Sequence, residues 1–515
     1  MESGFSYNND EYDYAMSLQR LLRNYKHEKN KQEDLRAQCL ITKAFMYAMV
    51  AHDNVRRKSG EAYVTHPIAV ALGLEKKQAD YQTICGALLH DTIEDCDWIT
   101  RETIEKEFGE NIATKVYGVT KVSIKNVSDK KRQIILTQNK LVISIIEDLG
   151  IIEIKIEDRK HNMSTIYGHK DPKKRKEIAA ETQDIYVPLA RHFGQYNDKE
   201  LLEGMSFRIL HPHIDKKIRD MKSELIQGNK ELSKLLFDLQ YDGSPRSIKK
   251  ELIKQGINVY DVEYKLKENP GIYRQLKKGK KFEKIPDLMT FIIKVDTVND
   301  VYKALQVINK NSVPINEGEY QMKDHISHPK YPYYRALHTY NIVESEGKKY
   351  LLHFQIQTME MWRESVDGIA SKWKYDVNDE GAMLMKKSLT QDFPFYEDLK
   401  RLIDEYKRGD ISDIDFNKKV KHLILPRLIY INMGDFTHEE TYDGSTIKDF
   451  VIRLCRKGKI DKICPNQEYY INGCKKDLNY KLKDEDTFEI RIKKPEVMDS
   501  EGNGENSFQR TKKQR

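Results

Sequence analysis

A short stretch of the chain places an unusual density of ionisable side chains directly after an apolar run. In residues 86–95, an alanine and two leucines precede one imidazole and three carboxylates, those of His90, Asp91, Glu94 and Asp95. On a helix, His90 and Glu94 share one face, and so do Asp91 and Asp95. Carboxylates at this density repel one another, so a cation bound between them is the economical explanation.

A solvated acidic helix end has the same composition and is the alternative interpretation of this stretch. The apolar residues before His90 favour the cation site, because they predict that the imidazole faces the protein interior. The stretch therefore predicts a helix that carries a metal site at its end.

The bulk composition limits the classes of protein that this chain can represent. With 515 residues, it is long enough for about two to four domains, each with its own core. Its hydrophobic content of 39% and charged content of 33% are typical of a soluble protein, and no apolar run has the length of a membrane span. The net charge of +7 does not by itself predict nucleic-acid binding.

The six cysteines form no CxxC pair, and the N-terminus is polar and acidic without a signal-peptide pattern. We therefore expect reduced thiols in a cytoplasmic protein rather than a disulfide framework or a zinc knuckle.

Two further polar segments could belong to the same site. Three cations at 56–58 precede a glycine-containing loop, and His66 stands before a proline that suits the first turn of a helix. The cations could bind phosphate, but a solvated basic loop is equally consistent. Asp158, Asn162 and Thr165 lie on one stripe of a predicted helix, a pattern that is more often a polar helix face.

The residue composition and the spacing of apolar residues change along the chain and predict several parts. They are an N-terminal arm (1–30), a helical domain (31–215), an α+β domain (216–385), a helical linker (386–427), a small strand-rich domain (428–493) and a disordered tail (494–515).

These motifs resemble the HD-superfamily hydrolase domain of RelA/SpoT alarmone enzymes. The resemblance is carried by His66-Pro67, His90-Asp91, Glu94-Asp95, Asp158 with His161-Asn162, the opening motif at 57–67, and the segments 118–121 and 181–190. It covers roughly residues 35 to 490 in the family's domain order. It implies an all-α HD-type helical domain, an α+β nucleotidyltransferase-like domain with a mixed sheet, and a small β-grasp-like TGS domain.

The resemblance also implies the roles of individual residues in the first domain. One divalent cation, Mn²⁺ in the family, would be held by His66, His90, Asp91 and Asp158. Ligand type alone suits Mn²⁺, Fe²⁺ and Zn²⁺ equally. Glu94 and Asp95 would position and deprotonate the attacking water. The substrate would be bound by Arg57, Lys58, Tyr63, Asn162 and Thr165.

The implied reaction removes the 3′-pyrophosphate from guanosine tetra- or pentaphosphate, (p)ppGpp, and leaves GDP or GTP. A substrate with several phosphates requires cations, and Arg57 offers a planar fork while Lys58 offers a point charge. Hydrolysis of another phosphorylated nucleotide stays open, because the specificity of the pocket depends on packing that the sequence does not reveal.

The second domain departs from the family pattern at positions that carry chemistry. It retains Asp287, Lys330, Tyr334 and His338, of which Tyr334 would stack on the guanine. The family's catalytic glutamate is replaced by His353, and an arginine is replaced by Gln357. Phosphoryl transfer requires carboxylates for Mg²⁺ and cations for the triphosphate, so we expect that synthesis is lost. The retained residues could bind GDP or GTP as a regulator, or could merely pack.

Two other classes of function remain open. One is a GTP pyrophosphokinase that tolerates these substitutions, and the other is a regulator that binds guanine nucleotides without catalysis. The TGS domain of long family members contacts tRNA on the ribosome through a histidine. Cys455 occupies that position here, so we do not expect contact with tRNA or the ribosome through this domain. We also expect no membrane partner, because no apolar run has the length of a membrane span.

Overall fold

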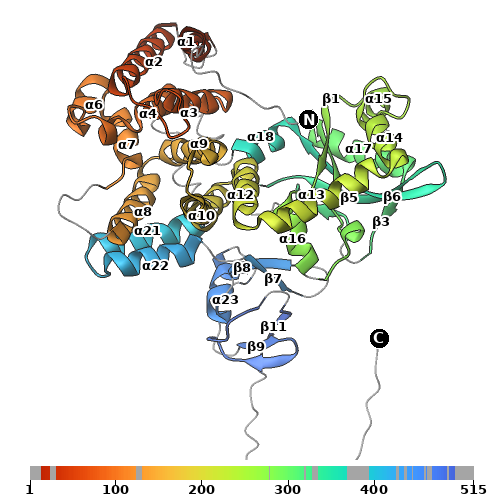
Figure 1. Ribbon diagram of the computed structural model, residues 1–515. Coiled ribbons are helices and arrows are strands. Elements are labelled where there is room, and N and C mark those ends of the chain that lie inside the picture. The colour runs from red at the N-terminus through yellow and green to blue at the C-terminus, as the bar shows by residue number, and fades with distance from the viewer. Residues whose placement is uncertain are drawn as a thin grey trace, which may run out of the picture. The chain divides into compact units, whose positions relative to one another are not determined.

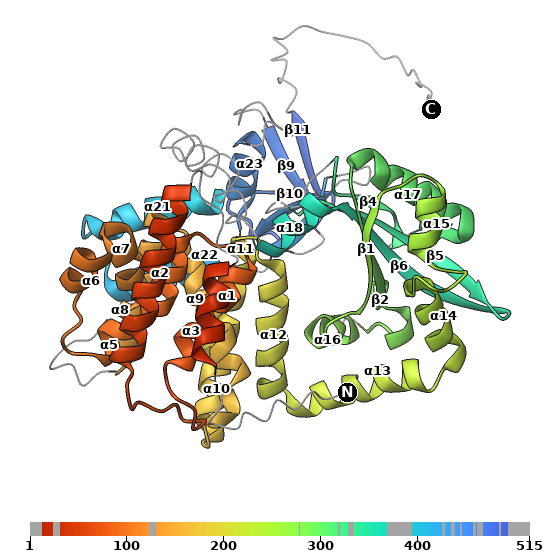
Figure 2. The ribbon, with the colours of Figure 1, turned by 90° about the horizontal axis from the view of Figure 1, so that it is seen from above.

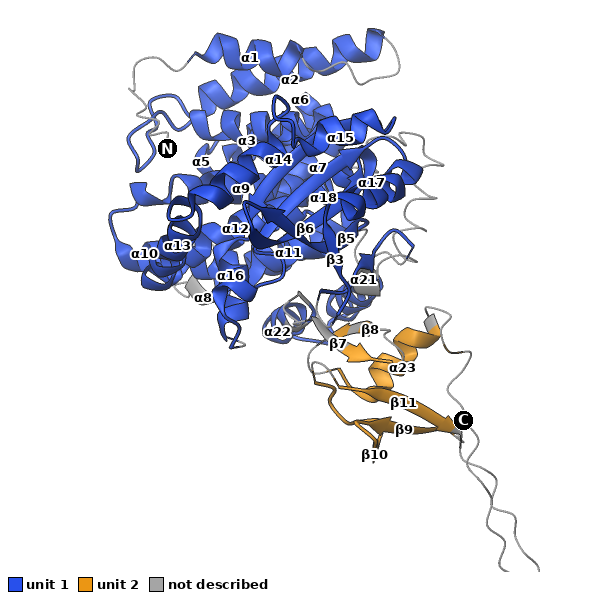
Figure 3. Cartoon of the chain, turned by 90° about the vertical axis from the view of Figure 1, so that its right-hand side faces the viewer, with its two compact units in different colours: residues 1–425 blue, residues 426–515 orange. Residues whose placement is uncertain are grey.

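The computed structural model describes residues 13–23, 31–122, 130–277, 279–317, 320–327, 334–367, 394–424, 428–433, 438–442, 445–456, 460, 467–483 and 486–492. They belong to two compact units, residues 1–425 and 426–515, which Figure 3 distinguishes by colour. The predicted tail at 494–515 lies outside the described residues, as does the predicted arm except for one helix.

The larger unit begins with a helical region, drawn from red to yellow in Figure 1. Its elements are α1 (Tyr14–Arg23), α2 (Lys31–Ala51), α3 (Thr65–Lys76), α4 (Tyr81–Leu89), α5 (Thr92–Asp95), α6 (Arg101–Phe108), α7 (Glu110–Val119), α8 (Lys130–Glu147), α9 (Gly150–Ser164), the 3-10 turn η1 (Ile166–Gly168), α10 (Pro172–Glu181), the π-helical turn η2 (Thr182–Tyr186), α11 (Val187–His192), α12 (Tyr196–Leu210) and α13 (Pro212–Gln227). None of the described helices is long and apolar enough to cross a bilayer.

Helices α4 and α9 form the centre of this region. α4 contacts α2, α3, α7 and α9, and every residue from Thr83 to Leu89 is buried. The first nine residues of α9, 150–158, are also buried. A helix covered on all sides needs no polar stripe, which explains the uninterrupted apolar run before His90. This central position holds the polar ends of both helices inside the protein.

The predicted helix over 86–95 is interrupted at the ionisable residues. α4 ends at Leu89, and the single turn α5 begins at Thr92. His90 and Thr92 each bond through the side chain to a backbone carbonyl of α4, those of Ala87 and Leu89, at 2.7 Å. The expected continuous helix over 86–95 is therefore wrong, because it is interrupted at His90 and Asp91.

The segment expected as a helical linker packs onto the helical region. Its described helices are α21 (Pro394–Lys407) and α22 (Asp413–Ile424). Leu399, Leu402, Ile403, Phe416 and Val420 are buried in the same core as α2, α4 and α9. Asn417 of α22 also donates to Asn139 of α8 at 2.9 Å.

The second region of the larger unit is an α/β structure with a mixed sheet. It contains α14 (Lys230–Gln240), α15 (Ile248–Lys254), β1 (Val259–Leu266), α16 (Asn269–Lys277), the 3-10 turn η3 (Phe282–Lys284), β2 (Met289–Val295), α17 (Val298–Asn311), β3 (Val313–Ile315), β4 (Lys323–Asp324), β5 (Leu337–Ser345), β6 (Lys348–Thr358) and α18 (Met359–Asp367).

The strand order is β1-β2-β6-β5-β3, and β4 also pairs with β5. β2 and β6 are parallel, while the other pairs are antiparallel, which confirms the predicted mixed sheet. Helices α14, α15 and α17 pack on the sheet, as Figure 2 shows. Strand β6 is buried along most of its length because it lies between β2 and β5.

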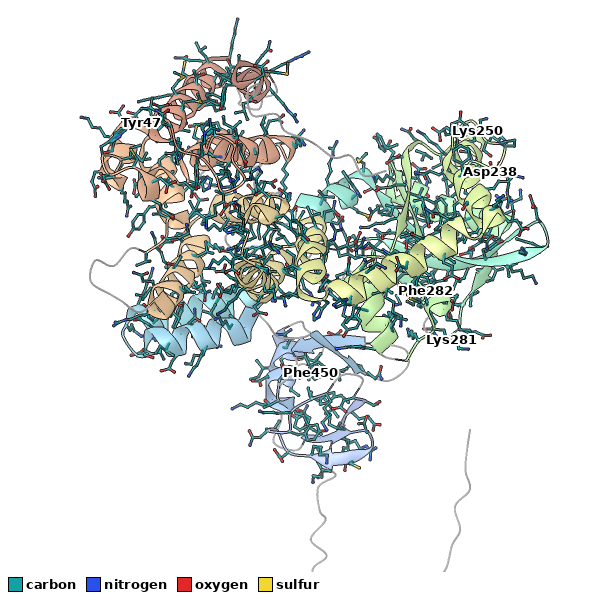
Figure 4. The ribbon with its side chains drawn as sticks, in the orientation of Figure 1. Tyr47, Asp238, Lys250, Lys281, Phe282 and Phe450 are labelled. Atoms are coloured by element: carbon teal, nitrogen blue, oxygen red, sulfur yellow. The ribbon has the colours of Figure 1, made fainter. Side chains whose placement is uncertain are left out.

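The smaller unit is a β-structure with one described helix. Its elements are β7 (Leu428–Asn432), β8 (His438–Tyr442), α23 (Ile447–Arg456), β9 (Gln467–Ile471), β10 (Cys474–Lys476) and β11 (Phe488–Ile492). A parallel bridge between Asn432 and Thr487 connects the β7–β8 hairpin to the sheet β10-β9-β11. Phe450 of α23, labelled in Figure 4, is fully buried and meets Phe488 edge to face at 5.1 Å.

We expect that Phe416→Ala destabilises the helical region by about 3–5 kcal/mol, because the fully buried ring stacks on Tyr406 at 4.4 Å. Urea unfolding followed by circular dichroism measures the loss. Phe237→Ala, at a ring that is 59% exposed, is the control and should cost less than about 1 kcal/mol. Equal losses would show that α22 does not stabilise the core.

Candidate metal centre

Four side chains from three parts of the helical region meet in the interior. They are His66 in the first turn of α3, His90 and Asp91 between α4 and α5, and Asp158 of α9. His66 Nε2 lies 3.2 Å from Asp158 Oδ1 and 3.6 Å from Asp91 Oδ2. His90 Nε2 lies 3.1 Å from Asp91 Oδ2 and 3.9 Å from Asp158 Oδ1. The structure thus brings together all four residues that the resemblance implied as metal ligands.

The orientation of His90 fits a metal ligand. Its Nδ1 lies 2.7 Å from the carbonyl oxygen of Ala87, so Nδ1–H donates and Nε2 carries the lone pair. Nε2 is buried and has no hydrogen-bond partner among the described residues. Burial opposes a charge on this ring, but Asp91 and Asp158 raise its pKa to about 9. The carboxylates therefore favour a positive charge at Nε2. Either a proton or a bound divalent cation can supply that charge.

His66 is oriented by a second imidazole. Its Nδ1 lies 2.8 Å from Nδ1 of His161, which also accepts from Arg57 Nη1 at 2.8 Å. Burial, together with the charges of His66 and Arg57, lowers the pKa of His161 to about 3. A neutral His161 accepts at Nδ1, so His66 donates from Nδ1 and turns Nε2 toward the two carboxylates.

Each carboxylate of the cluster is held by a neighbouring donor. The Tyr63 hydroxyl donates to Asp91 Oδ2 at 2.8 Å, and the Asn162 amide donates to Asp158 Oδ1 at 2.5 Å. Burial opposes ionisation of Asp158, yet Lys155, His66 and His90 hold its pKa well below its ordinary value. Both carboxylates are therefore in the ionised form that binds a cation.

Glu94 and Asp95 lie in different environments beside the cluster. Lys121 donates to both oxygens of Glu94, through its backbone N–H and, at 2.6 Å, through Nζ. Asp95 lies beside His52, whose Nδ1 is 3.7 Å from Asp95 Oδ2. Burial and the negative charges of Asp91 and Glu94 raise the pKa of Asp95. Glu94 is thus held by two hydrogen bonds from Lys121, whereas the raised pKa of Asp95 suits a group that accepts a proton.

The residues expected to bind substrate surround this cluster. Arg57 donates to Asn162 Oδ1 at 2.8 Å, so its guanidinium lies beside the ligand-bearing helix α9. Thr165 ends the helix and bonds to the carbonyl of His161 at 3.1 Å. Lys58 is exposed, with Nζ 3.5 Å from His169. Of the predicted stripe, Asp158 belongs to the four-residue cluster and Asn162 contacts both Asp158 and Arg57, whereas the Thr165 hydroxyl bonds within its own helix.

Comparison with protein families assigns both regions of the larger unit. Residues 44–196 match the family model described as HD domain, and residues 264–380 match the model described as region found in RelA / SpoT proteins. The chain contains an HD domain followed by a RelA/SpoT region. The metal cluster lies within the HD domain, whose fold is that of metal-dependent hydrolases.

Curated relatives resemble the chain over much of its length. A guanosine-3′,5′-bis(diphosphate) 3′-pyrophosphohydrolase of Aquifex aeolicus is 33% identical over 87% of this chain and 60% of its own length. A GTP pyrophosphokinase rsh of Brucella ovis is 35% identical over 72% of this chain and 47% of its own length. The chain therefore spans about half to three fifths of these relatives.

Among solved structures, the small alarmone synthetase 1 of Bacillus subtilis bound to its product pppGpp is 16% identical to this chain. The similarity covers 38% of this chain and 97% of that chain, with a TM-score of 0.24.

The RelA/SpoT region has its own polar cluster on strands β2, β5 and β6. His353 Nδ1 lies 2.9 Å from Thr290 Oγ1, and His353 Nε2 lies 2.8 Å from His338 Nδ1. His338 Nε2 in turn lies 2.8 Å from the Tyr334 hydroxyl. Burial lowers the pKa of His353 to about 4, so the ring is neutral. His353, which stands where the resemblance places the family's glutamate, thus belongs to a hydrogen-bonded chain with His338 and Tyr334.

The other retained residues of this region are also engaged by the protein. Asp287 forms an ion pair with Lys267. Burial opposes its charge, but Lys267 holds the pKa of Asp287 below its ordinary value. The ring of Tyr334 lies 5.7 Å from that of Tyr196 and 6.0 Å from that of His325. Lys330 lies outside the described residues.

Sequence reasoning gave no role to several residues that the structure places at the HD site. Lys121 and His161 stand in motifs that carried the resemblance, so their neighbourhood pointed to them. Lys155 lies three residues before Asp158 and bonds to it at 3.3 Å, a spacing that a helical wheel identifies. His52 follows the last residue of α2, and no local pattern distinguishes it.

We expect that Tyr63→Phe weakens binding of a divalent metal by about 10- to 100-fold, because Asp91 loses the donor that orients it. Titration of the metal-free protein with Mn²⁺, followed by calorimetry, measures the affinity. Tyr167→Phe, at a tyrosine that is 63% exposed, is the matched control. Unchanged affinity in Tyr63→Phe would show that the hydroxyl does not orient the ligand.

Proposed function

We propose that the chain hydrolyses (p)ppGpp to GDP or GTP and pyrophosphate. The observation that carries this proposal is the convergence of His66, His90, Asp91 and Asp158, with Glu94 and Asp95 beside them. The names of the Aquifex relative and of further relatives from Synechocystis and Vibrio cholerae support the substrate. Guanosine tetraphosphate would present its 3′-pyrophosphate to the cluster.

We assign the metal as Mn²⁺ from the resemblance to the RelA/SpoT family, because a donor set of two imidazoles and two carboxylates would suit Fe²⁺ and Zn²⁺ as well. His66 and His90 would bind through Nε2, and Asp91 and Asp158 through one oxygen each. A bound divalent cation lowers the pKa of a water and polarises a phosphoryl oxygen. Tyr63, His161 and Asn162 hold the ligands in place and so keep the water and the phosphorus aligned.

The two neighbouring carboxylates would then have different tasks. Asp95, whose pKa is raised by burial, Asp91 and Glu94, accepts the proton of the attacking water. Glu94, with both oxygens bonded to Lys121, cannot turn freely and orients the water from a fixed position. A carboxylate with a raised pKa is the better base near neutral pH, which favours Asp95 for proton transfer.

Arg57 and Lys58 would bind the phosphates of the substrate. Arg57 keeps its guanidinium in place through His161 and Asn162, which reduces the entropy lost on binding. Thr165 and Asn162 would line the nucleoside pocket. The exposed Lys58 adds a positive charge at the edge of the site.

We propose that the RelA/SpoT region does not synthesise (p)ppGpp. Magnesium-dependent phosphoryl transfer requires carboxylates that are available to the metal. Here Asp287 is neutralised by Lys267, and His353 bonds to Thr290 and His338. Gln357 replaces an arginine, and its uncharged amide cannot neutralise a triphosphate. Its side chain is also fully buried.

The second candidate function is GTP pyrophosphokinase activity, which the name of the Brucella relatives favours. A third role, binding of GDP or GTP at Tyr334 and His338, competes with the packing of these rings against Tyr196 and His325. An assay with ATP separates synthesis from binding, because only synthesis transfers pyrophosphate.

We further propose that the smaller unit is a TGS domain. Its β7–β8 hairpin, helix α23 and β9–β11 sheet are joined by the parallel bridge at Asn432, which supports a β-grasp arrangement. We also propose domain boundaries at residues 215, 385, 427 and 493. We further propose that the protein is cytoplasmic and does not bind tRNA or the ribosome.

Purified protein with Mn²⁺ and guanosine tetraphosphate is expected to release GDP and pyrophosphate, and EDTA should abolish the release. Asp95→Asn should lower kcat by about a hundredfold or more, because the amide cannot accept the proton. Glu94→Gln should lower kcat less, by about tenfold, since Lys121 loses an ionic partner but the base remains. Separation of nucleotides by anion exchange measures the products.

Glu177→Gln, at an exposed glutamate of α10, is the control for these substitutions. Wild-type protein that releases no pyrophosphate would overturn the proposed hydrolysis. A larger loss in Glu94→Gln than in Asp95→Asn would reverse the assignment of the base.

Synthesis is best measured in the Asp95→Asn variant, so that any product persists. With ATP, Mg²⁺ and GDP or GTP, this variant is expected to form no (p)ppGpp above the blank, because His353 and Gln357 replace a metal ligand and a cation. Formation of labelled (p)ppGpp from γ-labelled ATP would show that the domain tolerates the replacements and is a pyrophosphokinase.

A further inference from the structure

His52 is a buried imidazole that neither the metal cluster nor the substrate-binding residues account for. It is 2% exposed and directly follows α2, where its backbone N–H bonds to Ala48 and its carbonyl accepts from Val55. Neither ring nitrogen has a hydrogen-bond partner within the described part of the chain. Buried polar groups are nearly always hydrogen-bonded, so an imidazole in this state needs an explanation.

The ring is aimed at the hydrolase site. Its Nδ1 lies 3.7 Å from Asp95 Oδ2, slightly beyond hydrogen-bond distance, and the centroid of its ring lies 4.8 Å from that of Tyr63. Tyr63 in turn bonds to the ligand Asp91. The carboxylate of Asp95 is therefore a polar partner within a short movement of His52 Nδ1.

The charges around both groups favour a neutral donor at this position. His52 is surrounded by Asp91, His90 and His66, and burial is the main reason that its pKa falls to about 4. Asp95 faces Asp91, Glu94, Lys121 and Tyr63. A neutral imidazole can donate from Nδ1 to the carboxylate without adding a charge to a site that already binds a cation.

We propose that His52 is a positioning residue of the hydrolase site, which holds the carboxylate of Asp95 toward the attacking water through a hydrogen bond from Nδ1. This inference rests on the proposed hydrolysis. The short movement that closes the 3.7 Å separation brings Asp95 into its working orientation, and apo geometries of catalytic hydrogen bonds are commonly long. His52 itself touches neither metal nor substrate.

The two ring nitrogens can be tested separately, because two amides imitate them. His52→Asn places an amide near the position of Nδ1, whereas His52→Gln places it near that of Nε2. His52→Asn should keep kcat within about threefold of the wild-type value, since a donor to Asp95 remains. His52→Gln should lower kcat by about 10- to 100-fold, with KM and Mn²⁺ affinity unchanged. His192→Asn, at a buried histidine of α11, controls for removal of an internal imidazole.

Two readouts distinguish positioning from a structural effect. In His52→Gln, the acidic limb of the kcat profile should move to higher pH by roughly half a unit or more, because Asp95 loses a donor to its charged form. In the Asp95→Asn background, His52→Gln should cause no further loss of kcat, since the two residues act on one step.

Equal kcat in the asparagine and glutamine variants would overturn the role of Nδ1, whether both are active or both impaired. A parallel fall in Mn²⁺ affinity, or an additive loss in the double variant, would assign His52 to the structure of the site instead. The wild-type protein is measured in the same assay. Absence of hydrolysis in the wild-type protein contradicts the proposed function. Wild-type hydrolysis together with an unchanged kcat in the His52 variants contradicts only this inference.

Discussion

The HD domain depends on the burial of two like charges. Asp91 and Asp158 are 8% and 7% exposed and approach the same two imidazoles. Burying one ionised carboxylate in an apolar interior is costly, and a second at the same point adds repulsion. The fold meets this cost with donors on every side, Tyr63 for Asp91 and Asn162 and Lys155 for Asp158.

These donors do not neutralise all of the negative charge between the two carboxylates, so a cation is still favoured there. His66 and His90 turn their Nδ1 atoms outward, to His161 and to a backbone carbonyl, so that both Nε2 atoms face the acids. His90 and Asp91 lie between α4 and α5, and the His90 ring bonds back to the end of α4. Glu94 bonds to Lys121, whereas Asp95 Oδ2 lies 3.7 Å from His52 Nδ1. The two carboxylates of α5 therefore meet different partners.

The sequence predicted the members of this site better than their arrangement. The density of ionisable residues after an apolar run pointed to a cation site at residues 90–95, and the stripe on α9 follows from helical geometry. The complete set of four implied ligands came from the family resemblance. The break after Leu89 depends on side-chain bonds from His90 and Thr92 to the backbone, which no spacing reveals. His52 and Lys121 come from distant segments, so their proximity to Asp95 and Glu94 is a product of tertiary packing. For the same reason α21 and α22 read as a linker, although Phe416 is part of the core.

In the RelA/SpoT region, histidines and an aspartate also form a polar cluster, but there they bond to partners within the protein. There Asp287 has a lysine partner, and His353, His338 and Tyr334 satisfy one another in a chain that ends at Thr290. Among the described residues, buried polar atoms without hydrogen-bond partners occur in both regions, at His52 and His90 in the HD domain and at Tyr264 and Gln357 in the RelA/SpoT region. Unsatisfied hydrogen bonds therefore do not distinguish the two clusters, whereas charge does. The HD cluster gathers two buried carboxylates around the same imidazoles, and such like charges favour a bound cation. In the RelA/SpoT region the carboxylate of Asp287 already has a lysine partner, so the described residues of that cluster present no comparable excess of negative charge.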